Sequence, residues 1–155
     1  MVLEGLPRAA RLYPTLACRP SGDIDLLLGT SDLGAGDGIL QGLGYEPASG
    51  RDPTFHHRRY DRTSGTGKEV VELHWASDPP SFGPPSTASI LESRRPVDLG
   101  GVTVWVPGEA MERDLLVRHF ARHGGLQAIL HLDLLLALQG ERYEHPLGAL
   151  VGDDL

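Results

Sequence analysis

The sequence has little cysteine and no long apolar run, and each shortage excludes a class of protein. Its single cysteine, Cys18, rules out an internal disulfide and any metal centre built from several thiolates. No apolar stretch approaches the ~20 residues needed to span a bilayer. Residues 1–4 also lack the basic flank and apolar core of a secretory signal. We therefore expect a cytoplasmic protein with no membrane partner.

Basic residues are also in short supply. The chain carries 14 Lys and Arg against 21 Asp and Glu, a net charge of −7. No global positive field is available to attract a nucleic-acid backbone, so we expect no large nucleic-acid partner. A nucleotide could still bind where metal ions and a few local arginines supply positive charge. With 155 residues, 40% hydrophobic and 23% charged, the chain fits one globular domain.

Two carboxylates one residue apart open an otherwise apolar run, Arg-Pro-Ser-Gly-Asp-Ile-Asp-Leu-Leu-Leu, at residues 19–28. If the run is a strand, Asp23 and Asp25 point to the same face, with Ile24, Leu26 and Leu28 on the other. Two adjacent anions repel each other, and a divalent cation between them removes that cost while gaining oxygen ligands. These residues alone leave open a plainer reading, a solvated turn at the start of a strand.

A third carboxylate lies in a second β-prone run at residues 69–75. Alternation places Glu72 and His74 on one face and Trp75 on the other, towards the core. A charge in mid-strand is costly unless it is paired or bound to metal. If the two runs are neighbouring strands, Glu72 joins Asp23 and Asp25 in a cluster suited to Mg²⁺.

The ordered motifs resemble the DNA polymerase beta-type nucleotidyltransferase superfamily. Within it, they are most similar to a bacterial group labelled uncharacterised nucleotidyltransferase. The motifs are Leu-Glu-Gly at residues 3–5, Arg19 to Leu27, Leu-Gly-Tyr at 43–45, Val-Glu-Leu-His-Trp at 71–75, and the histidines His119 and His123. The resemblance covers about residues 3–138. It implies an α+β fold, with helices packed on a mixed β-sheet and a C-terminal helical hairpin. We expect a domain at 1–138 and a C-terminal tail at 139–155.

The resemblance also implies an activity. The expected enzyme moves a nucleotidyl group from a nucleoside triphosphate, such as ATP, to an unknown small-molecule or protein acceptor. Two Mg²⁺ ions, or Mn²⁺ as the alternative, would be bound by Asp23, Asp25 and Glu72. Glu72 would also accept the acceptor's proton, and Arg19 would contact phosphate through its bidentate fork. The remaining residues expected to contact the nucleotide are Gly5, Ser21, Gly22 and His74. A homo-oligomer is compatible with this interpretation.

Two departures from the family pattern keep other hypotheses open. Glu4 stands where the group usually has Lys, and Leu6 stands where the wider superfamily often has Ser. The superfamily also has a helix before the glycine, for which there is no room here. Together these features suggest a second hypothesis, a non-catalytic nucleotide-binding relative. The third is a metal hydrolase using His119 and His123, whose spacing of four on a helix can bind a transition metal. The sequence lacks the Glu of the His-Glu-x-x-His protease motif, because Phe120 stands in its place.

Hydrophobic patterns predict the remaining elements. A helix from residue 33 to 43 should bury Leu33, Ile39, Leu40 and Leu43. A hairpin of residues 55–61 and 69–77 should bring His56, His57, Arg58 and Arg59 near Glu72 and His74. We also expect a short helix at 8–12, a proline-rich loop at 78–89, a hairpin of 97–99 with 102–106, and helices at 109–123 and 126–138. The last of these should bury a stripe of Leu130, Leu134 and Leu138.

Overall fold

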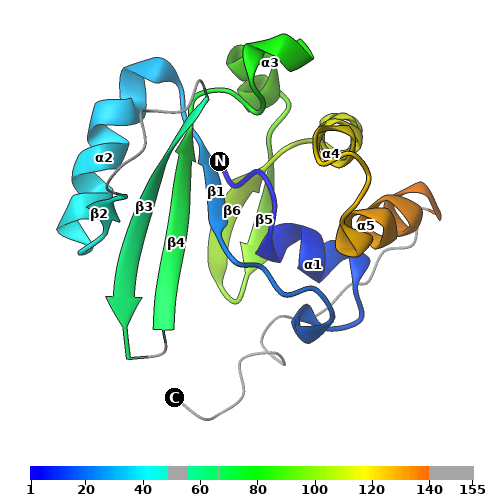
Figure 1. The fold of residues 1–155 in the computed structure, drawn as a ribbon, viewed down its shortest axis with the longest axis horizontal. Helices are drawn as coiled ribbons and strands as arrows, with labels where there is room; N and C mark the ends of the chain where they lie inside the picture. The colour runs from blue at the N-terminus through cyan, green and yellow to red at the C-terminus, as the bar shows by residue number, and fades with distance from the viewer. Residues whose placement is uncertain (49–55, 66, 140–155) are drawn as a thin grey trace.

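A four-stranded mixed sheet forms the centre of the fold, with helices on both faces (Figure 1). The computed structural model describes residues 1–48, 56–65 and 67–139. The strand order is β1-β4-β3-β2; β1 pairs with β4 in parallel, and the other pairs are antiparallel. The strands are β1 (Ile24–Leu27), β2 (Glu46–Pro47), β3 (His57–Ser64) and β4 (Gly67–His74). This arrangement confirms the expected α+β class.

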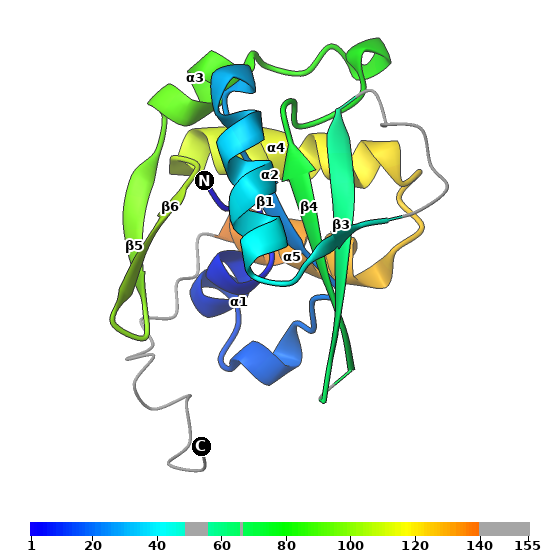
Figure 2. The same ribbon diagram turned by 90° about the vertical axis from the view of Figure 1, so that its left-hand side faces the viewer.

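One helix covers one face of the sheet, and three helices lie on the opposite side (Figures 1 and 2). The single helix is α2 (Leu33–Gly42), and the three are α1 (Leu6–Leu12), α4 (Glu109–Arg122) and α5 (Ala128–Gln139). A short helix, α3 (Thr87–Glu92), follows the sheet. The α4–α5 pair is the expected helical hairpin, closed by Gly124 and Gly125 with positive φ. No helix in the described part of the chain is long and apolar enough to cross a membrane.

Apart from Asp25, strand β1 is apolar, as expected for a strand that is covered on both faces. Leu26 and Leu28 pack into the cluster between the sheet and α2. Leu27, fully buried, points the other way and packs with Ile90 of α3 and Leu115 of α4. A third cluster joins α1, α4 and α5 through Leu12, Tyr13, Leu116 and Ala137. Asp25 shares the Leu27 side, so its carboxylate lies between the sheet and α4.

The first residues of the chain run antiparallel beside β1. Leu3 donates its amide hydrogen to the carbonyl of Asp25, and Leu27 donates to the carbonyl of Met1. Val2 also donates to the carbonyl of Trp105 in a second sheet, the hairpin of β5 (Arg95–Leu99) and β6 (Val102–Val106). Its turn is Gly100-Gly101, both with positive φ, as the sequence predicts. This pairing sets Leu3 opposite Asp25, and the following residue, Glu4, lines the same cavity as Asp25.

Some packing predictions are wrong, and glycine explains one of them. Ile39 and Leu43 are exposed, at 64% and 57%, whereas Leu40 is buried. Helix α2 contacts the sheet through Gly36, where an added Cβ would lie 2.6 Å from Cδ1 of Leu28. Because the closest approach is at a residue without a side chain, the buried stripe is narrower than the pattern indicated.

Other differences concern the bounds of elements. Strands β3 and β4 extend into the expected loop, so the turn between them is much shorter. Helix α3 begins at Thr87, inside the expected proline-rich loop, and Ser86 caps it by accepting a hydrogen bond from the amide of Ser89. Leu138 is 68% exposed, and Asp133 and Ala137 are buried on α5 instead. Phe55 and most of the predicted tail lie outside the described residues.

The glycines of α2 provide a matched test of this packing. Gly38 has no atom within 4 Å of an added Cβ, so Gly38→Ala should raise the free energy of unfolding by about 0.5–1 kcal/mol through helix propensity. Gly36→Ala gains the same propensity but crowds Leu28 and Leu73, and overpacking costs about 1–3 kcal/mol. Urea denaturation should therefore rank Gly38→Ala above wild type and Gly36→Ala below Gly38→Ala. Equal stabilisation by both substitutions would contradict the close contact.

Candidate active site

The candidate site is built where β1 and β4 run side by side. Their parallel register pairs Asp25 with Glu72, and Leu27 with His74. Asp25 is 8% exposed and the Glu72 side chain 19%, so both carboxylates are largely removed from bulk water. Ligand atoms of Asp25, Glu72 and His74 lie within 4.8 Å of one another. The structure therefore brings Asp25 and Glu72 of the predicted carboxylate cluster together with His74, whereas Asp23 is not a member of this group.

His74 lies between the two carboxylates and contacts both. Its Nε2 is 3.3 Å from Oδ1 of Asp25 and 3.5 Å from Oε2 of Glu72. Burial opposes the charged ring, but the hydrogen bonds to Asp25 and Glu72 raise the pKa of His74 to about 9. A protonated imidazolium thus supplies the positive charge that two neighbouring carboxylates need.

The carboxylates respond differently to this environment. Burial raises the pKa of Asp25 to about 6, against the hydrogen bond from His74 that acts to lower it. The hydrogen bond with His74 lowers the pKa of Glu72. Asp23 lies just before β1, and burial, followed by the charge of Glu72, raises its pKa. Of the three carboxylates, Glu72 thus acts directly on Asp23, whereas Asp25 and Glu72 are coupled to His74.

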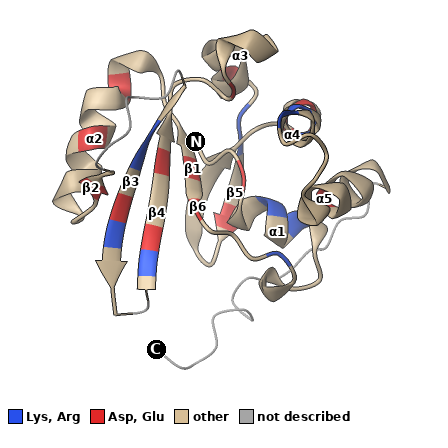
Figure 3. Ribbon diagram, in the orientation of Figure 1, with Lys and Arg blue, Asp and Glu red and all other residues tan. Residues whose placement is uncertain are grey.

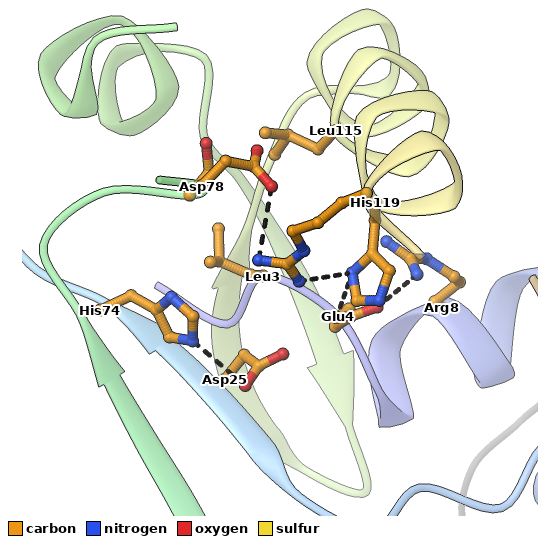
Figure 4. Close-up of a pocket in the computed structure, with 10 residues that line it drawn as sticks. Leu3, Glu4, Arg8, Asp25, His74, Asp78, Leu115 and His119 are labelled. Atoms are coloured by element: carbon orange, nitrogen blue, oxygen red, sulfur yellow. Dashed lines mark hydrogen bonds and ion pairs between the residues drawn. The ribbon is translucent and has the colours of Figure 1, made fainter. Parts of the chain in front are cut away.

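Glu4 adds a fourth carboxylate to this region (Figure 4). Its Oε2 lies 2.6 Å from Nη1 of Arg8, and its Oε1 lies 2.9 Å from Nδ1 of His119 on α4. Burial acts to raise the pKa of Glu4, but the hydrogen bond with His119 and the charge of Arg8 hold it well below its usual value. Glu4, Asp25, His74 and His119 line one small polar cavity of about 30 Å³, room for about two water molecules.

The loop residues predicted to contact the nucleotide lie at the edge of the cluster. Gly5 has φ of 86°, and an added Cβ would lie 3.2 Å from Oγ of Ser21. Ser21 donates a hydrogen bond to the carbonyl of Asp23, which holds the loop before β1. Ser21, Gly22 and Asp23 line a second, larger cavity of about 570 Å³ with mainly apolar walls. Its apolar lining includes Leu6, Pro7, Leu16, Ile24 and Val70.

Arg19 is placed differently from the prediction. It is buried, and its Nε and Nη2 donate to both oxygens of Asp133 on α5, at 2.8–3.0 Å. Tyr13 also donates to Asp133. A carboxylate of the protein therefore holds the bidentate face that a phosphate contact would use. Asp133 was missed by the sequence analysis, although a lone acid in an apolar helix is a signal for a buried ion pair.

The basic residues of β3 divide between the two faces of the sheet. Both acidic and basic residues lie along β3 and β4 (Figure 3). His57 and Arg59 pair in register with His74 and Glu72, and Nε2 of His57 lies 3.2 Å from Oε2 of Glu72. Arg58 instead reaches Asp37 of α2, at 3.7 Å. Of the two arginines, only Arg59 lies on the carboxylate side.

The histidine pair at the C-terminal end of α4 does not form part of a metal cluster in the described part of the chain. His119 and His123 stack with ring centroids 4.6 Å apart, but Nδ1 of His119 is bound by Glu4. Nδ1 of His123 lies 3.2 Å from Nε2 of Gln127. The contacts of His119 therefore orient it towards the carboxylate cluster through Glu4.

Comparison with known proteins identifies a family. A family model described as uncharacterised nucleotidyltransferase matches residues 1–144. None of the curated proteins and none of the solved structures searched matches the chain. The family match spans the strands, loops and helices that build the carboxylate cluster.

The raised pKa of His74 predicts how stability depends on pH without metal. The folded protein binds this proton more tightly than the unfolded chain, whose His pKa is 6.5. The stabilisation is therefore complete below pH 6.5 and is lost as pH rises through about 9. The loss is on the order of 3 kcal/mol. The raised pKa of Asp25 also makes the free energy of unfolding fall as pH rises, but in a separate window between pH 3.8 and about 6.

Urea denaturation in EDTA from pH 6 to 10 measures this dependence. The free energy of unfolding should fall with pH in the wild type, and His74→Gln should flatten the curve above pH 6.5. His131→Gln, a change at an exposed histidine of α5, is the matched control and should keep the wild-type slope. A His74→Gln curve parallel to wild type would show that His74 is not held as a cation.

Proposed function

The chain belongs to the uncharacterised nucleotidyltransferase family, and on that premise we propose that it transfers a nucleotidyl group from a nucleoside triphosphate to a hydroxyl or amine acceptor. One observation carries the proposal: the parallel register of β1 and β4 sets Asp25 opposite Glu72, with both carboxylates largely buried. Buried like charges on adjacent strands are costly for stability alone, which favours a functional reason for them.

The donors of the cluster fit a hard divalent cation. Asp23, Asp25 and Glu72 offer carboxylate oxygens, the ligand type that Mg²⁺ and Mn²⁺ prefer. The two carboxylates that contact His74 need a positive charge near them, as its raised pKa indicates. When bound, the metal ions would neutralise triphosphate charge and lower the pKa of the acceptor group.

The residues of the cluster then take different roles. Asp23 and Asp25 would share the ions, and Glu72 would hold the ion nearer the acceptor. Because its pKa is lowered, Glu72 is a good anionic ligand and a weak base. We therefore assign Glu72 to ligation and leave the acceptor's proton to solvent or to another carboxylate. His74 would keep the carboxylates oriented while the site is without metal.

Arg59 supports phosphate binding better than Arg19 does. It pairs in register with Glu72, its side chain is 40% exposed, and its guanidinium forms an ion pair with Asp61 at 3.0 Å. A guanidinium on the rim of an acidic site can bind triphosphate oxygens as they approach. The larger cavity beside Asp23 has room and apolar walls for the body of the substrate.

Nucleotide binding and transfer can be tested separately. In thermal unfolding, Mg²⁺ plus each nucleoside triphosphate in turn should raise the melting temperature. A ligand at 100 times its Kd adds about 2.7 kcal/mol, or roughly 5–10 °C for a chain of this size. Transfer is then followed with triphosphate labelled at the α-phosphate and, separately, at the γ-phosphate, in the presence of a metabolite extract. Product labelled only from the α-phosphate indicates nucleotidyl transfer. Stabilisation without any labelled product would favour the non-catalytic alternative.

Asp25→Asn should abolish both the metal-dependent stabilisation by triphosphate and product formation, because it removes a ligand charge while keeping side-chain size. Asp114→Asn makes the same change on the exposed surface of α4 and is the matched control. Melting temperatures and α-label incorporation check both variants. Full turnover by Asp25→Asn would overturn the assignment of the catalytic cluster.

Arg59→Gln should weaken triphosphate binding about 10- to 100-fold, as expected for loss of a hydrogen bond to a charged group worth about 1.5–3 kcal/mol. Arg58→Gln, one residue away on the opposite face, is the control and should bind as wild type does. Titration of each variant by calorimetry gives the two dissociation constants. If both variants lose the same affinity for triphosphate, Arg59 has no specific role in phosphate binding.

A further inference from the structure

We propose that His56, His57 and His74 form a second metal site, for a transition-metal ion of the Zn²⁺ type, beside the carboxylate cluster. One ring nitrogen from each of the three lies within 4.8 Å of the others. Imidazole nitrogen is a preferred donor for Zn²⁺, Co²⁺ and Ni²⁺, whereas Mg²⁺ prefers carboxylate oxygen. The two donor sets therefore suit different ions. His74, which contacts Asp25 and Glu72, must give up its extra proton to join the histidine set.

The fold holds the three rings in place. His57 and His74 are directly paired across the β3–β4 ladder, which puts their side chains on the same face. Their ring centroids are 4.8 Å apart, and the His56 ring lies 4.4 Å from His57 and 5.7 Å from His74. Nitrogens that share a tetrahedral Zn²⁺ are about 3.3 Å apart, given Zn–N bonds of about 2.0–2.1 Å. Side-chain rotations that bring the nitrogens from within 4.8 Å to this spacing would close the set around an ion.

His56 provides the second observation that points to a ligand. The ring is 7% exposed, and its Nδ1 is buried without a hydrogen-bond partner among the residues that the structure describes. A buried polar atom left in this state is costly. An ion bound at Nδ1 would satisfy the atom.

The charges around His56 allow a cation. Nε2 of His56 lies 3.4 Å from Nη1 of Arg122, which also lies 3.5 Å from Oδ1 of Asp78. Binding of metal at Nδ1 moves the ring proton to Nε2, so Arg122 must turn towards Asp78, which offsets its charge. On the other side, Oε2 of Glu72 lies 3.2 Å from Nε2 of His57. Three histidine nitrogens fill three of the four positions of a tetrahedral ion. The fourth position stays open for water or substrate, as in catalytic zinc sites.

The test uses Co²⁺ as a spectroscopic probe for the Zn²⁺ site in full-length protein treated with EDTA. Wild-type protein should bind one Co²⁺ with visible d–d absorption that excess Mg²⁺ does not remove and Zn²⁺ does. His56→Asn should weaken Co²⁺ binding at least about tenfold, since loss of outer-shell partners alone costs 10- to 100-fold. His123→Asn, in the stacked pair on α4, is the matched control and should bind as wild type does.

The proposal is overturned if wild-type protein shows no visible Co²⁺ absorption, or if His56→Asn binds Co²⁺ as tightly as His123→Asn. Circular dichroism establishes that each variant is folded. If His56→Asn is not, His57→Asn at the less buried position decides by the same comparison. No nucleotide is present in the titration, so its failure is distinguishable from failure of the proposed transfer.

Discussion

The site depends on one constraint: two buried carboxylates on adjacent parallel strands must share a positive charge. Asp25 and Glu72 face each other only because β1 pairs with β4 in this register; a shift of one residue would turn one of them to the opposite face. In the structure the shared charge is the His74 side chain, which contacts both carboxylates. Removing one partner of such a buried set leaves an uncompensated charge, which is far more costly than never forming the set.

The scaffold around the carboxylates is itself held by buried ion pairs. Asp133 of α5 binds Arg19 and accepts from Tyr13, which joins the segment before β1 to the C-terminal helical hairpin. Arg8 of α1 connects Glu4 with Asp133, at 2.6 and 3.5 Å from their carboxylate oxygens. These contacts fix the strand end that carries Asp23 and Asp25 relative to α4 and α5. Breaking a buried pair of this kind typically costs about 3–5 kcal/mol, so these residues support the site without contacting a substrate.

The alternation of residues along each strand was enough to predict which side chains share a face. The contacts between residues far apart in the sequence could not be predicted in this way. Alternation placed Glu72 with His74, and a carboxylate in mid-strand indicated a paired partner. The partner of Arg19 lies 114 residues away, and no local signal identifies which buried acid an arginine will meet. The exposed Ile39 and Leu43 illustrate the same limit, because the buried face of α2 depends on where Gly36 approaches the sheet.

Glu4 shows how the surroundings change the meaning of a departure from a family pattern. Replacing a lysine by a glutamate changes the local charge by two and, in isolation, would repel a triphosphate. Here the carboxylate is turned inward, bound by Arg8 and His119, and hydrogen-bonded towards Asp25. Its charge is therefore largely compensated within the protein, where screening by solvent is weak and each contact counts for more. Under the proposed function, the positive charge for an incoming phosphate would then come from elsewhere, and of the two adjacent β3 arginines only Arg59 is on the carboxylate side of the sheet.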